Sequence, residues 1–183
     1  IDDLKSVCAN YGLGNDGNEF KIITQVFLYK FLNDKFAYEV KKIEPKLEND
    51  DNWQETLSNY KKDDYDMLLM QLSEGTAQIQ PNHFIASLFN KQNEPDFAML
   101  FDDTLLDIAK LNTEVFSVKE EGGAKVVLFD RVSEYVTISK RDAFCKAIIN
   151  KLINFSFERI FSEKYDFYAT IFEYLISDYN KDS

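Results

Sequence analysis

The side chains that most often carry catalysis are scattered along this chain, without the spacing that a reaction centre needs. His83 is the single histidine, and neither a second histidine nor a cysteine pair lies nearby to complete a metal site. Asp102 and Asp103 suggest a pair of carboxylates for acid–base chemistry, but neighbouring residues on a helix point to different faces. We therefore expect His83 at the surface or at a helix N-terminus, and the two aspartates in contact with solvent.

Motifs for nucleophilic catalysis and nucleotide binding are not evident either. No serine, threonine or cysteine has a general base that the sequence identifies. Gly12 and Gly14 form a Gly-x-Gly, but they follow an expected helix and no third glycine comes in register, which is typical of a helix end. Cys8 and Cys145 are isolated thiols, and we expect both to be reduced and buried in a cytosolic protein. The sequence thus predicts no catalytic, cofactor-binding or metal-binding residue in this chain.

Basic residues form two modest clusters that could contact DNA or another subunit. One lies near the end of an expected helix and comprises Lys41, Lys42 and Lys46. The other lies around an expected hairpin and the helix after it, and comprises Arg131, Lys140, Arg141 and Lys146. A solvated face is the simpler interpretation. The alternative is an edge that contacts phosphates once a larger enzyme closes on DNA.

The composition is that of a folded, acidic chain. Its 183 residues are 45% hydrophobic and include 16 Phe and 10 Tyr, enough to fill the core of a single domain over residues 1–183. The 32 acidic and 21 basic residues give a formal net charge of −11, which repels phosphate and argues against nucleic-acid binding by this chain alone. Apolar runs are short and the first residues are acidic, so we expect no membrane span and a cytoplasmic location.

Apolar periodicity predicts a mainly α fold, an irregular helical bundle with one small β-hairpin insertion. The longest helix is expected over about 18–42, after a capping box of Asp16 and Glu19, with apolar residues on several sides that make it the centre of the bundle. A short helix should precede it. Asn52 with Glu55, and Ser139 with Asp142, also have capping-box spacing. Further helices are expected around residues 53–60, 65–72, 81–89, 97–112 and 144–155, with a polar break at 45–51 and a loop at 73–82.

Two further elements complete the expected fold. Residues 115–118 and 125–129 are β-branched or aromatic and flank a Glu-Glu-Gly-Gly turn, which predicts the hairpin or a mobile extended flap. Apolar residues share one helical face over 168–179, and we expect this last helix to pack against the central one. The polar residues 180–183 are typical of a linker, so we expect the natural chain to continue.

Three stretches carry a resemblance to a known family: FKIITQVFLYKFLNDKF (20–36), LFDDTLLDIAKLN (100–112) and DFYATIFEYLISDYNKDS (166–183). In this order they resemble the N-terminal helical domain of the modification (methylase) subunit of type I restriction-modification systems. The resemblance implies an adenine-N6 DNA methyltransferase that uses S-adenosylmethionine. The Asn/Asp-Pro-Pro-aromatic tetrad and the glycine-rich turn of such enzymes are missing here, so their domain is expected after residue 183.

The resemblance also implies partners. In that family two methylase subunits join one specificity subunit, a restriction subunit completes the nuclease, and the N-terminal domain helps enclose DNA and contacts neighbouring subunits. This chain by itself should neither bind the cofactor nor transfer a methyl group.

The alternative interpretation is a stand-alone acidic helical protein-interaction domain, for example a DNA mimic. The net charge favours it, but lysines are interleaved with the carboxylates, as in Lys61-Lys62-Asp63-Asp64. The DNA target sequence, the oligomeric state and the surface that meets the specificity subunit are not encoded in any pattern that the sequence shows.

Overall fold

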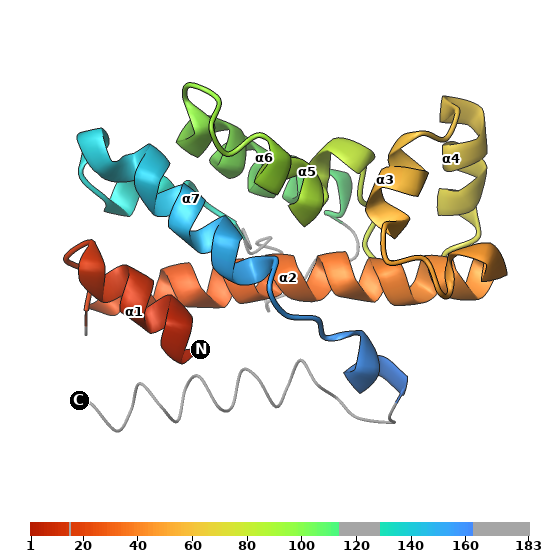
Figure 1. The fold of residues 1–183 in the computed structure, drawn as a ribbon, viewed down its shortest axis with the longest axis horizontal. Coiled ribbons are helices and arrows are strands. Elements are labelled where there is room, and N and C mark those ends of the chain that lie inside the picture. Colours follow the sequence, from red (N-terminus) through yellow and green to blue (C-terminus); the bar gives the residue numbers. More distant parts are fainter. Residues whose placement is uncertain (15, 114–128, 163–183) are drawn as a thin grey trace, which may run out of the picture.

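The computed structural model describes residues 1–14, 16–113 and 129–162, and the regular structure within them is helical (Figure 1). The predicted mainly α class is confirmed. The hairpin predicted within 115–129, apart from Phe129, and the helix predicted over 168–179 lie outside the described residues. The α-helices are α1 (Asp2–Asn10), α2 (Gly17–Ile43), α3 (Trp53–Ser58), α4 (Lys62–Met70), α5 (Ile85–Asn90), α6 (Phe97–Leu111) and α7 (Arg141–Leu152).

Within the described residues, five short 3-10 turns lie between these helices or after the last of them. They are η1 (Pro45–Leu47), η2 (Pro81–His83), η3 (Val132–Tyr135), η4 (Ile138–Lys140) and η5 (Glu158–Ser162). The loop predicted at 73–82 is present up to η2, and Gly75 has the positive φ of +86° that its turn requires.

Helix α2 is the centre of the molecule, as its all-round apolar pattern predicts. Sixteen of its 27 residues are buried, so it contacts other elements on several sides. Asp16 is its N-cap, as expected, because the Asn18 backbone N–H donates to Asp16 Oδ1 at 2.9 Å; of the predicted capping box, this hydrogen bond is the part that the structure shows. At the other end Pro45 follows directly after Glu44 and favours a turn over further helix.

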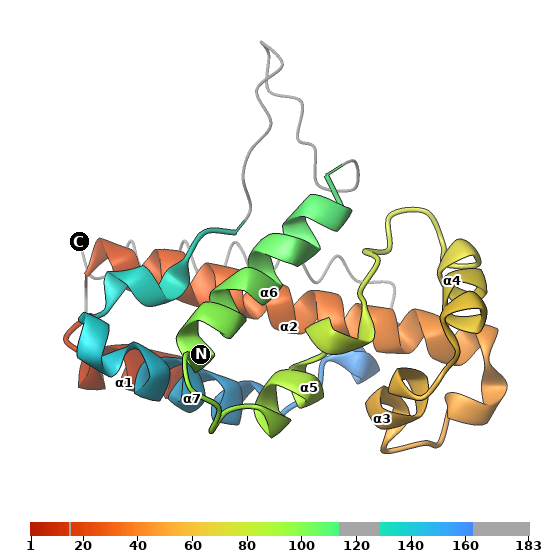
Figure 2. The same ribbon diagram turned by 90° about the horizontal axis from the view of Figure 1, so that it is seen from above.

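The other helices cover α2 along its length. Figure 1 shows α1 and α7 beside its N-terminal half, with α3 and α4 at its C-terminal end. Seen from above, α6 crosses over α2, and α5 lies between α6 and α3 (Figure 2). Contacts of α7 with α1, α5 and α6 join these layers into one hydrophobic core.

Two of the predicted capping boxes are wrong. The side chain of Asn52 does not cap α3; instead Asp50 accepts from the Asn52 N–H at 2.8 Å and from the Thr56 hydroxyl at 2.6 Å. Ser139 lies inside η4, which runs directly into α7, so it cannot take the extended backbone of an N-cap. Its expected partner Asp142 accepts from the Ala98 N–H of α6 at 2.9 Å.

The helix predicted to resume near Pro81 is interrupted. After η2 the chain is extended at Phe84, with ψ of 144°, and α5 begins at Ile85. The first N–H groups of α5 are satisfied from other helices, because Ile85 N–H donates to Asn33 of α2 at 3.0 Å and Ala86 N–H donates to Gln54 of α3 at 2.9 Å. The N-termini of α5 and α6 are thus both capped by residues distant in sequence.

Candidate functional site at the C-terminal end of the central helix

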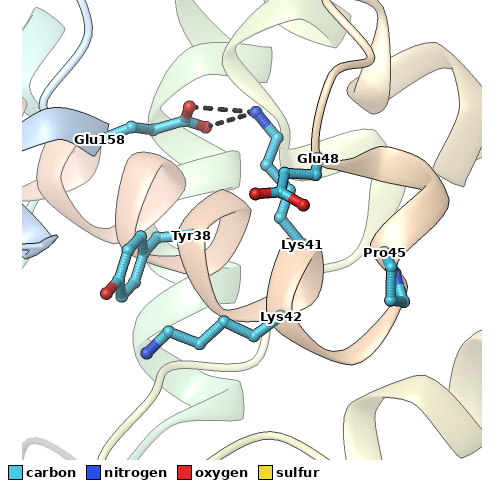
Figure 3. A pocket seen from close by; sticks show the side chains of 6 residues that line it. All are labelled: Tyr38, Lys41, Lys42, Pro45, Glu48 and Glu158. Carbon is cyan, nitrogen blue, oxygen red and sulfur yellow. Dashed lines mark hydrogen bonds and ion pairs between the residues drawn. The ribbon is translucent and has the colours of Figure 1, made fainter.

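A pocket of about 260 Å³ lies at the C-terminal end of α2. Figure 3 shows the side chains around it, which come from the last turns of α2, from η1 and the residue after it, and from η5. They are Tyr38, Lys41, Lys42, Pro45, Glu48 and Glu158. Two of the seven basic residues singled out in the sequence, Lys41 and Lys42, therefore line this pocket.

The turn at Pro45 and the segment 154–162 bring the pocket walls together. This segment runs along α2 toward the C-terminal end of that helix. Phe157 stacks on Phe27 with ring centroids 5.9 Å apart. Phe161 continues the contact by packing edge-on against Phe31 at 5.3 Å. Glu158 lies between these two phenylalanines and reaches Lys41. The pocket thus depends on residues more than a hundred positions apart.

Opposite charges pair within the pocket. Lys41 Nζ lies 3.0 and 3.1 Å from the two carboxylate oxygens of Glu158, the pair joined by dashed lines in Figure 3. Lys42 Nζ lies 4.1 Å from the centroid of the Tyr38 ring and 3.7 Å from Glu39. Since two lysines and two glutamates line the pocket, their formal charges cancel. The pocket suits a small polar or zwitterionic group better than a polyanion.

The third lysine of this cluster lies outside the pocket. Lys46, on η1, lies with its Nζ 5.1 Å from the centroid of the Tyr60 ring and is exposed. The hydrogen bond between the Lys46 ammonium and the Tyr60 side chain raises the pKa of Lys46.

The second basic cluster lies on η4, on α7 and on the segment before them, which packs against the N-terminal half of α2. The segment that carries it begins at Asp130, whose backbone N–H and carboxylate bond the side-chain amide of Gln25 at 2.8 and 2.9 Å. Gln25 and Lys41 are sixteen residues apart on one helix, which separates them by about 24 Å along its axis. The two clusters therefore do not form one continuous basic surface.

Most cations of this second cluster bond protein groups. Arg131 donates to Asp103 at 2.8 Å, and Arg141 Nε donates to the Val136 carbonyl at 3.0 Å. Lys146 donates to the side-chain oxygen of Asn93. Lys140 is exposed on η4. The arginine contacts stabilise the turns before α7. They do not test the predicted contact with DNA or with another subunit.

A buried polar cluster in the middle of α2 was not identified from the sequence. Lys30 and Asp34 form an ion pair at 3.4 Å with both side chains 6% exposed. Asp34 also accepts from the Phe157 backbone N–H at 2.8 Å and from Asn33 at 3.1 Å. Burial raises the pKa of Asp34 and lowers that of Lys30. The only sequence signal was two charges, i and i+4, within an otherwise apolar helix.

The expectation that Asp102 and Asp103 are both solvated is wrong for Asp102. Asp102 is 2% exposed and accepts from both the backbone N–H and the hydroxyl of Ser133, the former at 3.1 Å. Burial raises the pKa of its carboxyl group. Asp103 is half-exposed and pairs with Arg131. The two residues point to different faces as expected. Each bonds a residue of the segment before η4: Asp102 bonds Ser133 and Asp103 bonds Arg131.

His83 is buried, which corrects the expected surface position. It is the last residue of η2 and 4% exposed, so a position just before a helix is correct while exposure is not. Its Nδ1 accepts from the Gln80 backbone N–H at 3.3 Å, and its Nε2 lies 3.7 Å from Asp107. This geometry fits a neutral imidazole with the proton on Nε2.

We predict that the single histidine titrates below its ordinary pKa of 6.5, because burial lowers the pKa of His83 while Asp107 partly opposes this shift. Just below pH 6.5 the unfolded chain then binds more protons than the folded one, so the free energy of unfolding falls as the pH drops through this window. The ring C2 proton in an NMR pH titration measures the midpoint directly. The variant Asp107→Asn should lower the midpoint further. A native midpoint above 6.5 would contradict the prediction.

Both cysteines are buried, as expected. Burial raises the pKa of Cys8 to about 12 and also raises that of Cys145, so neither is a reactive thiolate at neutral pH. Among the described residues no three His, Cys, Asp or Glu side chains gather as metal ligands. Within the same part of the chain, every helix is too short or too polar to cross a membrane.

No protein-family profile, curated protein or solved structure matches this chain.

Proposed function

We propose that this chain is the N-terminal helical domain of a type I restriction-modification DNA methyltransferase subunit. The observation that supports the proposal is the position of the resembling stretches in the fold. Residues 20–36 form most of α2, and residues 100–112 form most of α6, which crosses it. The resemblance therefore involves the elements that organise the fold. The third stretch, 166–183, lies outside the described residues.

In this proposal the domain helps enclose DNA and contacts the specificity subunit in a cytoplasmic assembly with a second methylase subunit and a restriction subunit. The reaction, transfer of a methyl group from S-adenosylmethionine to adenine N6, belongs to a further domain of the same protein. The candidate contacts to DNA or to a subunit remain the two basic clusters. Lys42, Lys46, Lys140 and Lys146 are the exposed members of these clusters.

Reconstitution tests the proposal. Under this proposal the full-length protein, co-expressed with its specificity subunit, should incorporate radioactive methyl groups from S-adenosylmethionine into DNA as N6-methyladenine. The chain of 183 residues alone should not. Methyl transfer by this chain alone, or none by the assembled complex on DNA that carries its site, would contradict the assignment.

Charge variants of the assembled complex test the predicted contact. Lys140→Ala with Lys146→Ala should reduce the salt dependence of DNA binding, with a log–log slope smaller by about 1 for each phosphate that is no longer neutralised. Lys21→Ala with Lys110→Ala removes two exposed lysines outside both clusters and is the matched control.

A stand-alone acidic interaction domain is the second candidate, and the net charge of −11 favours it. Under that hypothesis the chain would copurify with a DNA-binding enzyme and compete with its DNA. Failure of the methyl-transfer test together with such competition would support it.

A further inference from the structure

Helix α4 buries one face, and its opposite, exposed face carries both methionines and aspartates. Tyr65, Leu68 and Leu69 face the core, and the Tyr65 hydroxyl donates to the carbonyl of Ile79. The exposed residues on the other side follow the spacing i, i+3, i+4 and i+7 of one helical stripe. They are Asp63, Asp66, Met67 and Met70, which we call the α4 outer face. Figures 1 and 2 both place α4 at one end of the molecule.

The two methionines of this face are unusually exposed for apolar side chains. Met67 is 62% exposed and Met70 84%, and the chain has only one other methionine, Met99. Exposed thioethers gain from being covered, because apolar surface leaves water. Their unbranched side chains adapt to the shape of a partner, and surfaces that bind helices are rich in methionine for this reason. The face thus has the chemistry of a binding surface rather than of a solvated one.

The charges around the methionines indicate that a partner of this face carries positive charge. Asp63 and Asp66 lie in the N-terminal half of the face, and Met67 and Met70 lie in its C-terminal half. Lys62 and Asp64 lie at its two margins. The N-terminal half of the face is therefore acidic, and the net charge of −11 adds a long-range attraction for cations.

We propose that the α4 outer face binds a basic amphipathic helix of a partner protein. Apolar side chains of that helix would pack side by side with Met67 and Met70, and its lysines or arginines would pair with Asp63 and Asp66. The seven residue steps from Asp63 to Met70 span about 10 Å, which corresponds to two turns of such a helix. The proposal is independent of the methyltransferase assignment, because it uses none of that family's features.

A model peptide tests the proposal directly. The probe is a fluorescein-labelled amphipathic helix of about 18 leucine and lysine residues, long enough to be helical when bound. Fluorescence anisotropy with the 183-residue chain should show saturable binding that weakens as salt is added. Met67→Ser with Met70→Ser should weaken binding at least about tenfold, as expected for the apolar centre of an interface. Asp63→Asn with Asp66→Asn should weaken binding and reduce its salt dependence.

Matched controls distinguish this face from general attraction to an acidic protein. Met99→Ser removes an exposed methionine elsewhere, and Asp2→Asn with Asp3→Asn removes two exposed carboxylates of α1. Both should leave the affinity within about twofold. In methionine-methyl NMR spectra the peptide should shift Met67 and Met70 but not Met99. Equal losses in the control variants, equal binding of a peptide with the same composition in scrambled order, or absence of saturable binding would overturn the proposal.

Discussion

Replacing Asp34 with alanine is expected to lower the free energy of unfolding by about 3–5 kcal/mol, the usual cost of removing one partner from a buried ion pair. The change would leave the ammonium of Lys30 without its carboxylate at a position where the side chain is 6% exposed. It would also remove the acceptor of the Phe157 N–H, which anchors the segment 154–162. Equilibrium unfolding in urea, followed by circular dichroism, measures the loss.

Two companion variants test whether the loss of stability in Asp34→Ala comes from the unpaired buried charge. Lys30→Met with Asp34→Leu replaces the pair by apolar side chains and should be clearly more stable than Asp34→Ala, because no unpaired charge stays buried. Lys21→Met changes an exposed lysine on the same helix and should cost less than about 1 kcal/mol. If Asp34→Ala costs no more than Lys21→Met, the buried pair is not what holds α2 to the 154–162 segment.

Replacing Asp102 with alanine should cost about 3 kcal/mol, because two hydrogen bonds to a buried carboxylate disappear and the groups of Ser133 stay buried. Asp103→Ala is a control from the adjacent position. It removes a single interaction with Arg131, between side chains that are both more than 40% exposed, and should cost less than about 1 kcal/mol.

The difference between the two aspartates can be measured in one series of unfolding curves. Asp102→Asn keeps the shape and one acceptor oxygen and should be intermediate. Amide hydrogen exchange of Ser133 should also accelerate in Asp102→Ala and not in Asp103→Ala, since only the former loses the acceptor of that N–H. Similar effects for both positions would mean that the burial of Asp102 has no energetic importance.

Several elements of this fold could be predicted from sequence because their signals are local. The start of α2 at Asp16, its burial on several sides and the end of α6 near Asn112 all follow from capping and from the 3.6-residue period. The burial of Cys8 and Cys145 follows from residue type. These features depend on residues within a few positions of each other, and for that reason the sequence alone predicted them correctly.

The candidate site could be predicted only in part. Lys41 and Lys42 were singled out as cations, but the sequence contains no sign that Glu158 would pair with Lys41 and close one wall of the pocket. The caps of α5 and α6 and the burial of Asp102 and His83 were missed for the same reason.

Within the described residues, local sequence thus determined most of the helical segments and the apolar faces of those helices, but not the break between η2 and α5. Long-range packing determined the partner of each polar group. Asp34 and Phe157 are 123 positions apart, and Asp142 caps a helix that begins 45 residues earlier. A hydrogen bond requires its two atoms to lie within about 3 Å of each other, and the periodicity of single helices does not specify how those helices pack. Each of these contacts is therefore a property of the assembled bundle.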